Sequence, residues 1–247
     1  MADVTFLRAD LEERPRTDMM LSPWLLLAML VAAAVAFALV LFAFFLGATG
    51  VDSDSLMVAP TLMIVLVGIA STAVSLYIVY HLVGRRDRHF RRLARLAEDA
   101  TVYLRSRAQE AGADLSGPLE QLERMQRTMR EQAGERGALI WAVLWVLAGL
   151  AVQYVLFYVL MQDFRRHEAS EVELTVALNE AFSALGAEPG IAFQPQIPER
   201  SFWLYVLLTL ITFGVWNLYW LYCMMADPNR HFVAQADWET RLWHAAV

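Results

Sequence analysis

The sequence predicts an all-α integral membrane protein with four transmembrane helices, and two observations carry this prediction. Hydrophobic residues make up 58% of the 247 residues, whereas a soluble domain contains roughly 45–50%. The excess is confined to four blocks that contain no Asp, Glu, Arg or Lys. Each block exceeds the roughly 20 residues that a helix needs to cross a bilayer core. The blocks are 23–46, 56–83, 138–161 and 202–225.

The four blocks divide the chain into seven parts. Ser22 and Pro23 are typical of a helix N-cap and first turn, so the first block is expected to be a retained helix and not a signal peptide. In chain order the parts are a cytoplasmic N-terminal tail (1–20), a transmembrane hairpin of spans one and two (21–83), a cytoplasmic helical hairpin (84–137), span three (138–161), an external amphipathic helix with a Pro-containing connection (162–201), span four (202–225) and a cytoplasmic interfacial tail (226–247).

Arginine counts predict which side of the membrane each part faces. Segment 84–137 contains twelve arginines, whereas loop 47–55 contains none and segment 162–201 contains three against seven acidic residues. Cytoplasmic loops carry the excess of basic residues. We therefore expect a multi-pass protein of the cell membrane with both termini in the cytoplasm and 162–201 outside.

Segment 84–137 is expected to form two antiparallel helices. Apolar residues recur at steps of three and four on both sides of a turn that contains Gly112, Gly117 and Pro118. The apolar seam closes on itself or pairs with another subunit, and both alternatives stay open at this point. The seam residues are Phe90, Leu93, Ala97, Ala100, Leu104, Leu119, Leu122, Met125 and Met129.

Segment 162–201 is expected to begin as an amphipathic helix. Leu174, Leu178 and Phe182 fall on one face, and Gly186 is a plausible C-cap. The polar face contains Glu168, Glu171 and Glu180, so we expect the helix to cover the ends of its own bundle and not an anionic lipid surface.

A run of arginines directly after the second block is the strongest candidate site. Basic residues beside a span attract anionic lipid, at about 1 kcal/mol per residue near the surface. A topology determinant is the simpler interpretation, and nucleic-acid binding is not expected because no recognition motif is present. The candidate lipid-binding residues are Arg85, Arg86, Arg88, Arg91, Arg92 and Arg95.

Polar residues inside the blocks are few and uncharged. Gln153 and Asn217 are the amides of the third and fourth blocks, and Thr209 and Thr212 complete a weak polar stripe. These four residues line a polar path or, more simply, form hydrogen bonds between helices. Active transport is disfavoured because the blocks lack the buried ionisable residues that a proton relay needs.

The polar cluster after the fourth block has a structural and a chemical interpretation. Asp227 and His231 lie four residues apart, a spacing that places two metal ligands on one helix face. Two ligands do not make a site, so no metal and no cofactor is expected. Asp227 is instead expected to cap a short surface helix whose apolar residues, including Phe232, Val233 and Trp243, lie at the inner interface.

The stretch LYVLLTLITFGVWNLYWLYCMMADPNRHF resembles the prokaryotic membrane family called domain of unknown function 4234. The positions that carry the resemblance are Ile211, Thr212, Gly214, Val215, Trp216, Trp220, Asp227 and Asn229. The resemblance covers about 45 residues at the C-terminus and implies a prokaryotic membrane domain without an assigned activity.

The sequence favours a non-catalytic function. Motifs for phosphate binding, serine or metal hydrolysis and redox chemistry are absent from it. We expect a scaffold or accessory subunit that acts through its extramembrane helices, with a homo-oligomeric ion or small-solute channel as the alternative. The expected partners are a bilayer with anionic lipids and either further copies of the chain or another membrane protein.

Overall fold

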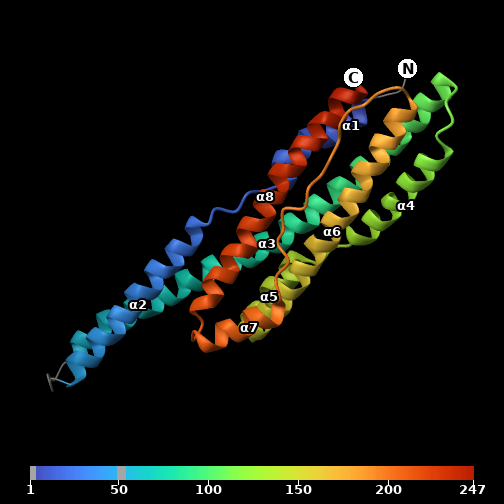
Figure 1. Ribbon diagram of the computed structural model, residues 1–247. Helices are drawn as coiled ribbons and strands as arrows, with labels where there is room; N and C mark the ends of the chain where they lie inside the picture. Colours follow the sequence, from blue (N-terminus) through green and yellow to red (C-terminus); the bar gives the residue numbers. More distant parts are fainter. Residues whose placement is uncertain (1–3, 49–53) are drawn as a thin grey trace.

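The computed structural model describes residues 4–48 and 54–247, and these residues form eight helices and no strand (Figure 1). The helices are α1 (Thr5–Thr17), α2 (Trp24–Ala48), α3 (Asp54–Ala111), α4 (Ser116–Gln132), α5 (Ala138–Ala148), α6 (Leu150–Ala184), α7 (Phe202–Ile211) and α8 (Val215–Ala246).

The long helix α3 joins two parts of different character. Its first half lies antiparallel to α2, and this pair projects away from the rest of the molecule (Figure 1). Its second half enters a bundle with α1, α4, α6 and α8, and both termini lie at the far end of this bundle (Figure 1). A helix of 58 residues is about 87 Å long at a rise of 1.5 Å per residue, so α3 serves both parts.

Among the described residues, two helices are long and apolar enough to cross a membrane. They are α2, over Trp24–Phe45, and α3, which has its apolar window in the first half of Pro60–Ala111. The prediction of four spans is therefore not confirmed. The third apolar block is broken at Gly149 into α5 and the start of α6, and the fourth is broken at 212–214 into α7 and the start of α8.

Each broken block forms a helical hairpin. The two ends of the third block lie at the same level, because Arg136, just before the block, pairs with Asp163, just after it, at 2.7 Å. In the fourth block, the Tyr205 ring lies 5.4 Å from that of Trp220 across the turn. Helices of 11 and 10 residues reach about 16 Å, half of a bilayer core. In each hairpin the chain therefore returns to the level at which it began.

The bundle has one hydrophobic core, to which α1, α3, α4, α6 and α8 all contribute. Most of the expected seam is inside it: Leu93, Ala97, Ala100, Leu104, Leu122 and Met129 are buried, and Leu119 and Met125 are partly buried against the core. Phe90 is also buried, but in a separate cluster with Phe164 and Phe232. The helical hairpin over 84–137 is thus present, and its seam packs against α6 and α8 of the same chain.

Segment 162–201 packs in the same bundle as segment 84–137, whereas the sequence predicts that a membrane separates the two. Leu174 and Phe182 of α6, and Phe193 of the extended connection, share the core with Leu93 of α3 and Leu122 of α4. Gly186, with φ 82°, follows the helix end as expected, but Glu168 and Glu171 are buried and do not face solvent.

Two further predictions about the ends of the chain need correction. Asp227 does not cap a helix, because α8 runs unbroken through it from Val215 to Ala246. The tail 226–247 is not interfacial, since Phe232 and Trp238 are 2% and 0% exposed inside the bundle. The N-terminal segment is also ordered: α1 packs on α3 and α8.

Candidate metal centre

Three buried histidines from three helices meet inside the bundle, just beyond the apolar part of α3. His89 comes from α3, His167 from α6 and His231 from α8, and each is at most 1% exposed. One ring nitrogen from each lies within 4.8 Å of the other two. The helices themselves are held by apolar packing around the cluster, where Phe90 stacks on His167 with the ring centroids 3.8 Å apart.

The hydrogen bonds of His89 and His231 orient both rings toward one point. His89 Nδ1 lies 2.7 Å from Asp18 Oδ1, and His231 Nδ1 lies 3.1 Å from Glu168 Oε1. A carboxylate only accepts hydrogen bonds, so each Nδ1 carries the proton. The two Nε2 atoms, 3.0 Å apart, then both present lone pairs to each other. In neutral imidazoles this contact has no proton to share, and a cation between the two nitrogens resolves it.

His167 and Glu171 complete the group. Both ring nitrogens of His167 lack a hydrogen-bond partner within the described residues, as does Glu171 Oε2. Glu171 Oε2 lies 3.6 Å from His231 Nε2, while Glu171 Oε1 accepts a 2.7 Å hydrogen bond from Trp238 Nε1. Buried polar atoms are nearly always satisfied in folded proteins. One of the unsatisfied nitrogens of His167 lies within 4.8 Å of a ring nitrogen of His89 and of His231, so the three histidines call for a shared partner, and Glu171 lies beside this group.

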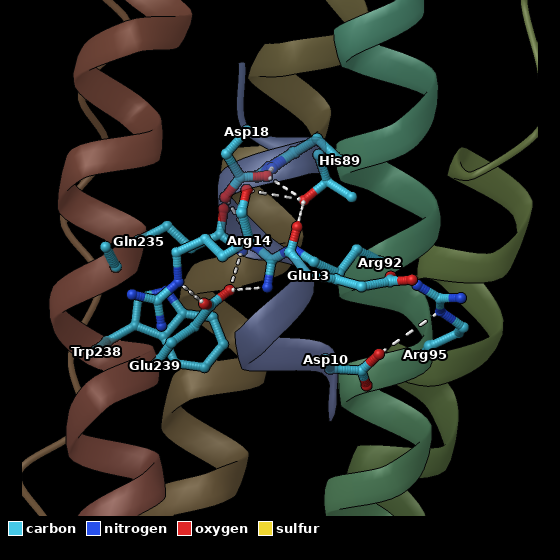
Figure 2. Close-up of polar contacts among 12 residues, drawn as sticks. Asp10, Glu13, Arg14, Asp18, His89, Arg92, Arg95, Gln235, Trp238 and Glu239 are labelled. Carbon is cyan, nitrogen blue, oxygen red and sulfur yellow. Dashed lines mark hydrogen bonds and ion pairs between the residues drawn. The ribbon is translucent and has the colours of Figure 1, made fainter. Parts of the chain in front are cut away.

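A second layer of charged groups surrounds the histidines. Figure 2 shows Arg14 of α1 and Arg92 of α3 reaching Glu239 of α8, with Asp18 beside His89. Arg92 also donates to Asp18 Oδ2 at 2.9 Å. These contacts attach α1 and the segment after it to the histidine cluster.

The charges of this cluster do not cancel. Asp18, Glu168, Glu171 and Glu239 contribute four carboxylates, and Arg14 and Arg92 contribute two guanidiniums. With neutral histidines and all four carboxylates ionised, two negative charges would remain in excess in a buried site, and protonation of Glu171 would leave one. Buried charges are paired or bound to a metal, and a divalent cation supplies the missing charge.

The shifts in pKa keep His89 and His167 in the neutral form, which is the form that binds a metal ion. They also favour uptake of a proton by Glu171. Burial, together with the neighbouring histidines, lowers the pKa of His167 well below its usual value, so the ring is neutral. Burial also lowers the pKa of His89 to about 4, although Asp18 opposes this shift. Burial raises the pKa of Glu171 well above its usual value, and a cation at the site reverses that effect.

The geometry suits a four-coordinate transition metal. Zn–N bonds of about 2.05 Å at the tetrahedral angle place two ligand nitrogens about 3.3 Å apart. The separations of 3.0 Å between the two Nε2 atoms and 3.6 Å between His231 Nε2 and Glu171 Oε2 lie on either side of this value. Asp18 and Glu168 are then the carboxylates that orient metal-bound imidazoles from behind.

The predicted lipid-binding arginines separate into two groups. Arg85, Arg86 and Arg92 are buried and bind internal partners, so these three are not lipid contacts. Arg85 donates to the Met224 carbonyl at 2.7 Å, and Arg86 donates to the Gln132 carbonyl at 2.7 Å. Arg88, Arg91 and Arg95 remain at least partly accessible.

The polar residues of the apolar blocks are engaged in hydrogen bonds. Gln153 Nε2 donates to Asn217 Oδ1 at 3.0 Å, and this bond joins the tips of the two hairpins as the simpler interpretation predicts. Thr209 and Thr212 donate to the backbone carbonyls four residues before them.

Sequence reasoning did not find the metal ligands, and the reason is physical. An external position of 162–201 separates His167 from His89 and His231, which leaves Asp227 and His231 as the pair of candidate ligands in the sequence. Asp227 points elsewhere and pairs with Arg200 and Arg230. The signal that does point to the site is His167 with Glu171, four residues apart on one helix face.

The positions that carry the family resemblance have structural roles in the fourth block. Gly214, with φ 91°, begins α8 after the turn, and Thr212 Oγ1 accepts a hydrogen bond from Trp216 N. Trp220 is fully buried between the hairpins. Asn229 donates to the Leu21 carbonyl and accepts from the Leu21 amide, which ties the N-terminal segment to α8.

Comparison with known proteins supports this resemblance. Residues 200–242 match the family model described as Domain of unknown function (DUF4234). Comparisons with curated proteins and with solved structures gave no match. The match includes His231 and Glu239 and confirms that the C-terminal segment of this chain is similar to the DUF4234 family.

Proposed function

We propose that the protein is a membrane-anchored metal-binding protein whose extramembrane bundle holds one divalent transition metal ion. The ligands are His89, His167, His231 and Glu171. Imidazole nitrogens disfavour Mg²⁺ and Ca²⁺, which prefer oxygen. Zn²⁺ is the ion that best suits three nitrogens and one carboxylate oxygen in a compact four-ligand arrangement.

The proposal rests mainly on the Nε2 atoms of His89 and His231, which face each other 3.0 Å apart. Both rings are fixed by carboxylates on their far nitrogens, which is the arrangement that metal-bound histidines usually have. If one of the two rings were protonated, its Nε2 would donate a hydrogen bond to the Nε2 of the other ring. That arrangement still leaves both ring nitrogens of His167 without a hydrogen-bond partner among the described residues.

The completeness of the ligand set favours a structural or sensing role over a hydrolytic one. Catalytic zinc sites keep a position open for water, whereas structural sites are closed by four protein ligands. All four ligands here are at most 1% exposed. The ion joins α3, α6 and α8, so its binding energy contributes directly to bundle stability.

Metal titration of histidine variants tests the proposal. The full-length protein in detergent is stripped with EDTA and titrated with Zn²⁺ against a chromophoric chelator. The wild type is expected to bind one ion per chain, and His167→Gln is expected to bind it at least about tenfold more weakly. His244→Gln is the matched control, because His244 is exposed and lies outside the cluster. Equal affinity of the two variants, or a wild type that binds no stoichiometric ion, contradicts the proposal.

We further propose how the chain lies in the cell membrane. The two helices α2 and α3 cross the bilayer, and the α5–α6 and α7–α8 hairpins enter it part-way from the side that holds the bundle. The basic excess of 84–137 places this side in the cytoplasm, and both termini with it. Exposed apolar side chains along α2, such as Phe37 and Phe44, are the lipid-facing surface.

The accessory or scaffold role that the sequence predicts stays a proposal and is compatible with metal binding. A metal ion that stabilises the bundle also stabilises the outer surface of the bundle. Binding of a partner protein to that surface then depends on the metal ion. The channel alternative gains no support from the polar residues of the hairpins, because their side chains are bonded to one another or to their own helices.

A further inference from the structure

We propose that a groove between α1, α3 and α4 binds the phosphate of an anionic phospholipid headgroup. The groove has a volume of about 490 Å³ and is lined by five arginines and one carboxylate, that of Glu13. The arginines are Arg16, Arg88, Arg91, Arg95 and Arg130. This site is separate from the histidine cluster and does not depend on the proposed metal, but it rests on the proposed crossing of the bilayer by α3.

Two of these arginines have no counter-ion in the fold. Arg16 and Arg88 form no ion pair with any carboxylate of residues 4–48 and 54–247. Arg88 is partly buried, and its Nη1 lies close to the Cα of Gly84, where an added Cβ would be 3.1 Å away. A guanidinium held against the backbone without a partner has its full donor capacity available for a phosphate.

The other three arginines have partners that a phosphate can replace. Arg91 pairs with Glu135, Arg95 with Glu13 and Asp10, and Arg130 with Glu98. The side chains of these three arginines are half exposed, and most of the acids they bind are also exposed. Ion pairs of this kind contribute little to stability. A phosphate offers the same guanidinium groups charge-assisted, bidentate hydrogen bonds.

The position of the groove along α3 favours the phosphate of a lipid over a soluble anion. Arg88 follows the last apolar residue of the second block, Val83, by five residues, or about 7.5 Å along the helix. The polar layer on each side of a bilayer core is about 5–8 Å thick. Arg88 therefore lies at headgroup depth, whereas Arg91 and Arg95, about 12 and 18 Å beyond Val83 by the same rise, continue the groove away from the bilayer.

Helix dipoles account for the positions of two of the five arginines in the groove, but not for the other three. Arg16 and Arg130 lie in the last turns of α1 and α4, where a cation is favoured by the helix dipole. Arg88, Arg91 and Arg95 lie in the middle of α3, far from either end. Three helices thus contribute positive charge to one cavity, and three of its five arginines are not explained by a helix terminus.

Native mass spectrometry of lipid adducts tests the proposal. The full-length protein is released from nanodiscs that contain equal amounts of phosphatidylglycerol and phosphatidylcholine. The wild type is expected to retain phosphatidylglycerol selectively. The double variant Arg16→Gln/Arg88→Gln is expected to bind it roughly thirtyfold more weakly. The control Arg107→Gln/Arg124→Gln removes the same charge from two exposed arginines outside the groove.

Three results overturn the proposal. One is retention of phosphatidylglycerol by Arg16→Gln/Arg88→Gln at the wild-type level. Another is an equal loss in the control, which indicates a general charge effect. The third is tight binding of inorganic phosphate by the lipid-free protein that prevents later lipid binding, which assigns the groove to a soluble anion. Zinc affinity, measured on the same samples, reports the metal site separately and is expected to stay unchanged.

Discussion

Individual polar side chains attach the N-terminal segment to the rest of the molecule. Asn229 accepts from the Leu21 amide at 3.2 Å, donates to the Leu21 carbonyl at 2.9 Å and accepts from Arg85 at 2.9 Å. Asp18, three residues earlier, accepts from His89 and Arg92. Burial would raise the pKa of Asp18, but His89 and Arg92 outweigh it and hold the pKa well below its usual range.

Asn229→Leu tests the strength of this attachment. The variant leaves the Leu21 amide and carbonyl without their partner, so we expect a loss of about 1–3 kcal/mol in the free energy of unfolding. Limited proteolysis near residue 20 should be faster than in the wild type. Asp237→Asn, at an exposed position of α8, serves as the control. Unchanged stability and proteolysis would show that the Asn229 contacts do not hold the segment.

Asp10 makes stability depend on pH. Burial and the nearby charge of Asp99 raise the pKa of Asp10 to about 7, above the usual value of 3.8. The folded state therefore holds this proton more tightly than the unfolded state. The contribution to stability is full below about pH 4 and is lost as the pH rises through 7. We expect Asp10→Asn to reduce the drop in thermal midpoint between pH 5 and pH 8. An identical drop in variant and wild type would contradict this.

At the scale of single elements, the breaks in the third and fourth apolar blocks were not predictable from hydropathy. Gly149 lies in an uninterrupted apolar run, where a glycine is equally compatible with close helix packing. The two breaks depend on φ values of 52° at Gly149 and 91° at Gly214. The surrounding sequence does not indicate that these glycines adopt positive φ values. The long periodic segments are different: their apolar seams identified the buried faces of α3, α4 and α6 because period alone determines which face is apolar.

Gly214→Ala tests the turn between α7 and α8. Nothing lies within 4 Å of an added Cβ, so the cost comes from the backbone conformation alone. We expect a loss of about 1–2 kcal/mol in the free energy of unfolding. Gly68→Ala is the matched control, since its Cβ also meets nothing within 4 Å and its φ is not positive. The control should be neutral or stabilising, and equal effects of the two changes would contradict the hairpin geometry.

At the scale of the whole molecule, topology decides which residues meet. The sequence indicates a basic segment over 84–137, and four spans would place α6 across the membrane from α4. In the structure, α6 packs in the same bundle as α4, and this packing brings His167 to His89 and His231. The composition, the helical class and the C-terminal resemblance were accessible from the sequence. The histidine cluster was not, because it depends on the number of membrane crossings.

Cysteine accessibility in intact cells tests this arrangement. In a Cys223→Ser background, reporter cysteines replace Arg107 and Glu188, which are both exposed. We expect a membrane-impermeant maleimide to leave both reporters unlabelled until the cells are lysed. Labelling of the residue-188 reporter but not the residue-107 reporter in intact cells would restore the four-span arrangement and exclude the shared bundle.

The most direct test of the metal centre is X-ray absorption spectroscopy of the full-length protein loaded with one equivalent of Zn²⁺. The account predicts a four-coordinate ion with three imidazole ligands and one oxygen ligand, at about 2.0–2.2 Å. His89→Gln should lose one imidazole from the first shell, whereas His81→Gln, outside the cluster, should retain all three. A first shell of six oxygens, or one with fewer than three imidazoles in the wild type, would contradict the proposed centre.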